Sequence, residues 1–342
     1  MFLIQINYRE FNMANFGIRS LASLFVGAMA SFSASIAIAQ VPSALAGKSV
    51  KIIVPQTAAG ASDSISRLMA AELTKRWGIS VIVENRPGAG GNIGSDAVAK
   101  SAPDGTTWLM SYSGTHAINP ALYGKMPFDP KKDLAPLASL ATLPFVLVIN
   151  PQLPYKTLAE YVAYAKANPG KINVSSSGNG SVNHLLNEML GTAAGIKTSH
   201  IPYKGAATAL NDVMSGQVQA FYASAPSVMG QIKSGAVRPL AAAATKRAAA
   251  LPDVPTFGEA GYPALSIDSW FAFFVQGATP QELKAQIHSE INKVLADPAI
   301  VEQLSQRGAA TMSTTLPAFQ KIVDDDMETW GKTVRASGAK ID

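Results

Sequence analysis

The segment VKIIVPQTAAGASD, residues 50–63, contains the pattern that determines the fold of this chain of 342 residues. Four of its first five residues are Val or Ile, which favour a buried strand. A loop of small and polar residues follows, and a helical pattern runs from about Ser64 to Trp77. We expect Asp63 to be the N-cap of this helix, because its carboxylate can accept a hydrogen bond from a free backbone N–H. A strand, a loop and a helix in this order predict a parallel sheet covered by helices.

The same alternation continues through most of the chain. Further strands are predicted at 81–84, 107–112, 145–150, 171–175, 199–203, 218–224, 238–244 and 269–275, and further helices at 92–100, 158–168, 182–194, 206–215 and 228–233. The final portion, 280–340, predicts helices only, since Pro280, Pro298 and Pro317 each stand where a helix begins. This helical tail has to pack on sheets formed earlier in the chain. The fold class is therefore α/β.

The pattern indicates two α/β lobes rather than one. If the helical tail returns to the first sheet, the chain crosses between lobes twice, near 145–151 and again near 268–275. We expect lobe 1 to comprise 47–147 plus 270–342, and lobe 2 to comprise 148–269. Two crossings make a hinge, so the ligand cleft is expected between the lobes.

The composition limits the classes of function. Hydrophobic residues make up 48% of the chain and charged residues 15%, which excludes a disordered protein. The 28 Lys and Arg residues only slightly exceed the 23 Asp and Glu residues, and they form no basic stripe, so no nucleic-acid partner is expected. The sequence contains no Cys, which excludes disulfides, thiol chemistry and Cys-bound metals. A monomer is expected for this architecture.

Residues 1–39 are predicted to be an export signal. Arg19 precedes an apolar stretch of small residues that ends in an A-x-A pattern, with cleavage expected near Ala39/Gln40. Met13 offers an alternative start that would give a tighter signal. Serines interrupt the apolar stretch, and no other apolar run approaches the roughly 20 residues needed to span a bilayer. The mature chain is therefore expected to be exported and not held in the membrane.

Three loops at predicted strand ends have the composition of an anion site. They are PQTAAGASD at 55–63, SSSGNGS at 175–181 and PYKGA at 202–206. In a parallel sheet such loops lead into helix N-termini, whose free N–H groups and dipole attract anions. A tight turn explains any one of these loops alone. Three of them, divided between two lobes, indicate a ligand site.

Other kinds of chemistry receive less support from the sequence. GAGGNIG at 88–94 looks like a dinucleotide fingerprint, but 85–87 separate it from its strand and the spacing differs from G-x-G-x-x-G. The four histidines have no metal-ligand spacing, and no G-x-S-x-G elbow is present. Ser181 and His184 can share a helical turn, so a secreted hydrolase stays an alternative, although a capping serine beside a polar histidine explains the pair better. No catalytic residue, metal or cofactor is predicted.

Several motifs resemble those of one family of periplasmic receptors. They are KIIVP at 51–55, VENRPGAGGNIG at 83–94, APDG at 102–105, GTHAINPALY at 114–123, SGNGS at 177–181, PYKG at 202–205 and LPDVPT at 251–256. With these motifs in family order, the chain is identified as a member of the Bug-type receptors of tripartite tricarboxylate transporters. The resemblance covers essentially the whole mature chain.

The resemblance implies a two-lobed periplasmic-binding-protein fold of the Venus-flytrap type (type II), and a periplasmic location. It also implies a small carboxylate ligand, which is a di- or tricarboxylate, an acidic amino acid or an aromatic acid, and a membrane partner of one large and one small integral subunit. A solute sensor that feeds a membrane signalling protein would use the same lobe surface and stays an alternative. The ligand contacts implied are Gln56, Thr57, Ala59, Gly60, Ser62, Ser111 and Ser113 in lobe 1, and Ser177, Asn179, Ser181, His184, Tyr203, Lys204, Gly205 and Ser224 in lobe 2.

Two departures from the family pattern affect the ligand. The first loop has Gln56-Thr57-Ala58-Ala59 where the family commonly has an aromatic residue and prolines, which removes bulk and adds hydrogen-bonding groups. The strand before Pro226 reads Tyr222-Ala223-Ser224 where the family often has Phe-Asp-Asn. The carboxylate that would pair with a ligand ammonium is missing there. We therefore expect a carboxylate ligand without an amino group.

Overall fold

The computed structural model describes residues 41–58 and 60–341. The predicted export signal and its cleavage site lie outside these residues, and so does Ala59. Among the helices of the described residues, none is both long and apolar enough to cross a membrane.

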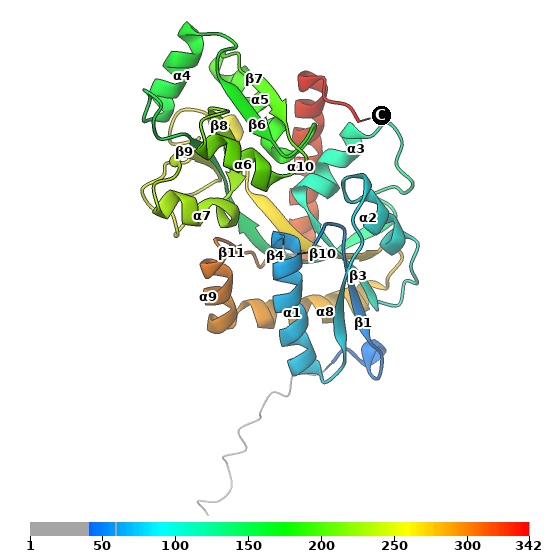
Figure 1. The fold of residues 1–342 in the computed structure, drawn as a ribbon. Helices are drawn as coiled ribbons and strands as arrows, with labels where there is room; N and C mark the ends of the chain where they lie inside the picture. The colour runs from blue at the N-terminus through cyan, green and yellow to red at the C-terminus, as the bar shows by residue number, and fades with distance from the viewer. Residues whose placement is uncertain (1–40, 59, 342) are drawn as a thin grey trace, which may run out of the picture. The chain divides into compact units, whose positions relative to one another are not determined.

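A six-stranded sheet is built from both ends of the described chain (Figure 1). Its strand order is β11-β4-β10-β3-β1-β2, with β1 (Val50–Val54), β2 (Val81–Asn85), β3 (Thr107–Tyr112), β4 (Leu134–Leu143), β10 (Ser269–Gln276) and β11 (Ala310–Thr311). Strand β1 pairs in parallel with β2 and β3, whereas β10 runs antiparallel to β3 and β4. The sheet is therefore mixed. It takes β1 to β4 from the N-terminal part of the described chain and β10 and β11 from the C-terminal part.

Different helices cover the two faces of this sheet, and alternate residues of each strand point toward one face or the other. Trp108 and Phe273 pack on one face with α1 (Ala61–Trp77), α8 (Gln281–Leu295) and α9 (Pro298–Gln306). Leu109 and Phe274 pack on the other face with α2 (Asn92–Ala99) and α10 (Leu316–Ser337). The period of two along each strand produces this separation.

A second sheet has five strands in the order β7-β6-β8-β5-β9. The strands are β5 (Phe145–Ile149), β6 (Asn173–Ser176), β7 (Ser199–Pro202), β8 (Ala220–Ser224) and β9 (Arg238–Ala243). Helices α4 (Leu158–Ala167) and α5 (Val182–Ala194) pack on one face, and α6 (Ala206–Met214) and α7 (Ala225–Lys233) pack on the other. Because β6 is parallel to both β7 and β8, the carboxyl ends of these three strands lie at one edge of the sheet.

The chain changes sheets twice. Only Pro144 separates β4 of the first sheet from β5 of the second, and the chain returns to the first sheet when β10 begins at Ser269. The first change lies one residue before the range 145–151 where a crossing was expected, and the second lies within the expected range 268–275. The division of residues between the two lobes stays a prediction.

The C-terminal helix α10, red in Figure 1, packs against elements of both sheets. Phe319 and Val323 belong to the core of the first sheet, whereas Trp330 and Val334 share a core with β5, β8 and α5 of the second. The tail is not purely helical as predicted, since β11 adds two residues to the edge of β4. A single helix thus joins the cores of the two lobes.

The start of α1 differs from the sequence prediction. The N-cap is Gly60 and the helix begins at Ala61, so Asp63 lies inside the first turn. The Asp63 carboxylate instead accepts hydrogen bonds from Arg67 Nε at 3.0 Å and Asn85 Nδ2 at 3.0 Å. This carboxylate therefore bonds to Arg67, one turn further along α1, and to the Asn85 amide at the end of β2.

Candidate functional site

A cavity of about 170 Å³ lies where the helices of the second sheet begin. Its lining residues are Tyr112, Phe145, Ser177, Ser181, Val182, Asn183, Ala206 and Ser224. Tyr112 comes from β3 of the first sheet and stacks on Phe271 with ring centroids 5.8 Å apart. The remaining residues come from the second sheet and its helices. The cavity is therefore lined by both sheets, but mainly by the second.

Three helix N-termini meet at this cavity. Ser181 is the N-cap of α5, Gly205 is the N-cap of α6 immediately before the lining residue Ala206, and Ser224 is the N-cap of α7. The first N–H groups of a helix have no partner within the helix, and the helix dipole places a partial positive charge there. At α7, the Ala225 N–H already donates to the carbonyl oxygen of Pro144 at 2.9 Å and Pro226 has no N–H, so this helix contributes chiefly its dipole. None of the lining residues carries a charge. The arrangement suits a small anion that is bound by neutral donors.

Asn183 ties the loop before α5 to the neighbouring strand. Ser177 Oγ donates to Asn183 Oδ1 at 2.5 Å, and Asn183 Nδ2 donates to the carbonyl oxygen of Tyr222 in β8. The side chain is buried and both of its polar atoms are used. The sequence prediction missed Asn183, although an amide inside the apolar run of α5 is the type of signal that marks a buried polar contact.

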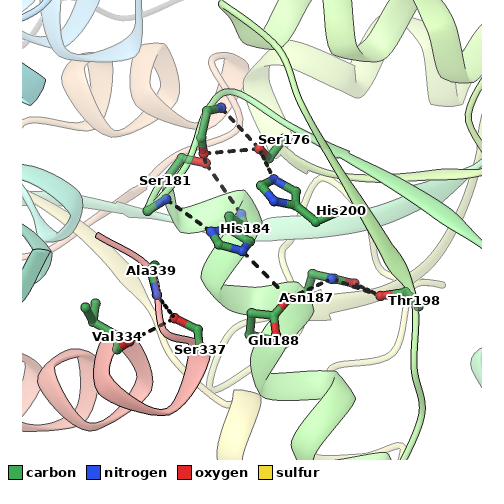
Figure 2. A network of polar contacts seen from close by, with 12 residues as sticks. Ser176, Ser181, His184, Asn187, Glu188, Thr198, His200, Val334, Ser337 and Ala339 are labelled. Atoms are coloured by element: carbon green, nitrogen blue, oxygen red, sulfur yellow. Dashed lines mark hydrogen bonds and ion pairs between the residues drawn. The ribbon is translucent and has the colours of Figure 1, made fainter. Parts of the chain in front are cut away.

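A pair of stacked histidines supports the same loop from below (Figure 2). The rings of His184 and His200 lie 3.8 Å apart and are nearly parallel. The backbone N–H of Gly180 donates to His184 Nδ1 at 3.1 Å, and His200 Nε2 lies 2.6 Å from Ser176 Oγ. These contacts hold the loop at the cavity wall.

Burial keeps this histidine pair neutral. Burial, with a smaller contribution from the neighbouring His200, lowers the pKa of His184 to about 4. Burial also lowers the pKa of His200. With a neutral ring, Nδ1 of His184 can accept the hydrogen bond from Gly180 and Nε2 carries the proton, 3.7 Å from Glu188 Oε1. Through this hydrogen bond His184 fixes the backbone of Gly180 in the loop.

The contacts of Ser181 are those of a helix cap. Its hydroxyl donates to the carbonyl oxygen of Gly178 at 2.7 Å and accepts from the backbone N–H of His184 at 3.5 Å. The ring of His184 contacts Gly180 and Glu188, and no hydrogen bond joins it to the Ser181 hydroxyl among the described residues. A base has to lie within hydrogen-bond reach of its nucleophile. The geometry thus gives the hydrolase alternative no support.

The loop at 202–206 meets the cavity at Ala206 and not at the side chains of Tyr203 and Lys204. The Tyr203 hydroxyl donates to Asp212 Oδ2 at 2.5 Å, and this bond raises the pKa of Tyr203 to about 12. Lys204 is exposed, and neither side chain lines the cavity. Gly205, with extended backbone, starts α6. Asn179 is exposed as well and lies outside the lining.

The predicted residues of the first sheet lie apart from this cavity. Gln56 Nε2 donates to Thr115 Oγ1 at 3.1 Å, and Thr57 is exposed. The hydroxyls of Ser111 and Ser113 are buried without a hydrogen-bond partner in the described part of the chain. Ser62 is buried, and Gly60 lines a different cavity. Of the predicted contacts, the structure brings together Ser177, Ser181 and Ser224, with His184 and Gly205 directly behind them.

A metal centre has no support in the residues 41–58 and 60–341. No group of three or more His, Asp or Glu side chains there could hold a metal ion.

Comparisons with known proteins agree with this architecture. The family described as "Tripartite tricarboxylate transporter family receptor" matches residues 65–339. Protein BugT of Bordetella pertussis is 36% identical over 85% of this chain and 90% of its own length. The structure of Rpa4515 from R. palustris with adipate has a TM-score of 0.77, with 31% identity over 85% of this chain and 98% of that one.

A second solved structure supports the same assignment. MatC (Rpa3494) from Rhodopseudomonas palustris, with bound malate, has a TM-score of 0.73 and 29% identity, and covers 84% of this chain and 98% of that one. The predicted family and the predicted α/β fold of two lobes are both confirmed. The chain belongs to the tripartite tricarboxylate transporter family of receptors, which are periplasmic solute-binding proteins.

Proposed function

We propose that this protein binds a small carboxylate in the 170 Å³ cavity and delivers it to a tripartite tricarboxylate-type membrane transporter. The observation that carries this proposal is the meeting of the N-termini of α5, α6 and α7 at one uncharged cavity. A carboxylate there would receive hydrogen bonds from backbone N–H groups. The hydroxyls of Ser177, Ser181 and Ser224 would donate to it after each turns its single proton away from its present acceptor, which is Asn183, Gly178 or Ser227 respectively. Each of these roles is part of the proposal.

Neutral donors are sufficient for useful affinity. A hydrogen bond to a charged group contributes about 1.5 to 3 kcal/mol, so a few such bonds reach micromolar affinity after the cost of immobilising the ligand. The lining contains no Arg or Lys. Tyr112 and Phe145 belong to strands of different sheets. A hinge movement between the lobes would therefore close the two side chains over the ligand and exclude water.

The lining and the relatives support a choice of ligand class. Adipate and malate, the ligands of two similar structures, are dicarboxylates without an amino group. The lining contains no Asp or Glu that could pair with an ammonium, and Ala223 stands where the family often has an aspartate. We therefore propose a carboxylate that lacks an amino group. Tight binding of aspartate or glutamate would contradict this choice.

The proposal also covers the location of the protein, its oligomeric state and its membrane partner. The mature protein would begin near Gln40, act in the periplasm as a monomer, and present its closed lobes to one large and one small integral subunit. Lobe 1 would comprise 47–147 and 270–342, and lobe 2 would comprise 148–269. The helix α10, which packs on both cores, would couple closure to the surface presented to the partner.

A thermal-shift screen tests the proposed function. The mature chain from Gln40 is mixed with aliphatic dicarboxylates, citrate-like tricarboxylates, aromatic acids and acidic amino acids. Ligand at about 100 times its Kd should stabilise the fold by roughly 2.7 kcal/mol. A shift confined to carboxylates without an amino group, with the compound recovered unchanged, is the expected result. Absence of any shift in protein freed of endogenous ligand, or chemical conversion of the compound, would overturn the proposal.

A further inference from the structure

A second cavity of about 250 Å³ lies next to the first. Leu143 and Pro226 line this second cavity, whereas Phe145 and Ser224 line the first. Leu143 and Phe145 are two residues apart in extended chain, a separation of about 6.6 Å, and Ser224 and Pro226 are the N-cap and the second residue of α7, so residues close in sequence line the two cavities. The second cavity also includes Gly60, in the loop that the sequence singled out.

Arg307 is the charged residue of this second cavity. Its Nε donates to Ser64 Oγ at 3.2 Å and its Nη1 donates to the carbonyl oxygen of Gln303 at 2.6 Å. The side chain is half-buried and forms no ion pair with a carboxylate of the described residues. By contrast, Arg76 and Arg247 each pair with a carboxylate. A guanidinium has five N–H donors, so Arg307 keeps donors that its present partners do not use.

The rest of the second cavity suits a carbon chain. Ile65, Leu143, Pro226 and Met229 supply apolar walls, and no acidic residue is among those that line it. The nearby Asp63 carboxylate is paired with Arg67 at 3.0 Å. An anion entering from the first cavity would therefore meet apolar surface and then a guanidinium that has no carboxylate partner among the described residues.

We propose that the Arg307 cavity is the subsite for the distal acidic group of an elongated dicarboxylate. The near carboxylate would lie at the starts of α5, α6 and α7, and the carbon chain would pass Leu143 and Pro226. Arg307 then determines specificity, because it selects ligands with a second negative charge over monoacids of the same length. This inference rests on the proposed function of the first cavity.

Isothermal titration with adipate and hexanoate tests the subsite, since the two acids have the same number of carbons and differ in the distal carboxylate. The protein is purified from the periplasm and freed of endogenous ligand. In Arg307→Gln, adipate affinity should fall about ten- to a hundredfold, as expected for a lost charge-assisted contact, while hexanoate affinity changes little. Arg335→Gln, which removes an exposed charge from α10, is the matched control and should alter neither affinity.

A second variant distinguishes loss of the subsite from a folding defect caused by the substitution of Arg307. Ser64→Asp places a carboxylate beside the intact Arg307, and it should cause the same selective loss of adipate binding. Equal losses for both acids, or no loss for either, would overturn the Arg307 subsite while leaving the proposed receptor function in place. If wild-type protein binds neither these acids nor any other carboxylate, the proposed function fails and the subsite fails with it.

Discussion

The two sheets use the same kind of strand-loop-helix unit in different ways. In the second sheet, three units open onto one cavity, and Ser177, Ser181 and Ser224 line it. In the first sheet, the loop after β1 directs Gln56 to Thr115, whose hydroxyl donates to the carbonyl oxygen of Gly90 at 3.2 Å. The Gln56 amide nitrogen is thus used within its own lobe, whereas the amide oxygen is buried without a hydrogen-bond partner among the described residues. Because β1 is parallel to β2 and β3, helix starts share one edge in the first sheet as well, so a shared edge alone does not turn polar groups toward a cavity.

This difference assigns unequal roles to the two sides. We expect the second sheet to hold the carboxylate, and the first sheet to cover it through Tyr112 and to select its far end through Arg307. Binding measurements on variants of each side can break or sharpen that division.

Filling the cavity from α6 should have the largest effect. In Ala206→Trp, the indole would occupy space that the ligand needs, because Ala206 lines the cavity. Affinity for the carboxylate identified in the screen should fall at least about a hundredfold, or about 2.8 kcal/mol. Ala207→Trp, at the exposed neighbouring position of the same helix, should bind normally. If both variants bind like wild type in titration calorimetry, the second sheet does not hold the ligand.

Breaking the Asn183 bridge should have the next largest effect. Asn183→Leu leaves the Ser177 hydroxyl and the carbonyl of Tyr222 without their partner, so stability should fall by about 1 to 3 kcal/mol. Affinity should fall about tenfold, because the loop loses its connection to β8. Urea unfolding and calorimetry measure the two quantities.

The matched control for this bridge lies one turn further along α5. Asn187 exchanges hydrogen bonds with Thr198 at 3.0 and 3.1 Å, away from the cavity loop (Figure 2). Asn187→Leu should lower stability similarly and leave affinity unchanged. Equal losses of affinity in the two variants would mean that general destabilisation, and not the position of Ser177, weakens binding.

Acid should lower the stability of the fold through buried histidines in both lobes, but it should lower ligand affinity through His184 alone. The pKa of His184 falls from 6.5 to about 4, so the unfolded chain binds the proton more tightly than the folded chain. The stability from a neutral His184 is fully present above pH 6.5 and is lost as pH falls through about 4. Discounted for partial solvation, it amounts to about 2 kcal/mol. In His184→Gln, urea unfolding should show a smaller loss of stability across this range.

His116 provides the contrasting variant in the first sheet. Burial against Phe274 lowers the pKa of His116 to about 3, so the same sign applies. His116→Phe should reduce the acid loss of stability but leave the acid loss of affinity intact, whereas His184→Gln should reduce both. The half-buried Asp326, with its pKa raised to about 6 by burial, contributes stability that is lost as pH rises, so only differences between variants are compared. An unchanged affinity profile in His184→Gln would contradict the role of His184.

The sequence predicted most strands and helices, but it did not predict which of them lie side by side in the structure. The Val- and Ile-rich strands and the small-residue loops were evident, but β4 was missed because LAPLASLATL is rich in Ala and contains Pro136. In the structure, Pro136 lies beside a register shift against Phe274, where a missing N–H is tolerated. Similarly, no local pattern states that Ala206 and Phe145 reach the same cavity as Ser177. That fact depends on the parallel pairing of β6 with β7 and β8, and on the antiparallel pairing of β5 with β8, which sets Phe145 opposite Ser224.

Changing Gln56 should have the smallest effect and gives the most direct test of the unequal roles. Gln56→Leu removes a hydrogen bond to Thr115 and also an amide oxygen that is buried without a partner among the described residues. Stability should therefore change by less than about 1 kcal/mol, because the lost bond is offset by the lost desolvation cost. Affinity should change less than about threefold. If calorimetry gives a loss as large as that of Asn183→Leu, the loop after β1 turns toward the ligand on closure, and the first sheet holds the carboxylate as firmly as the second.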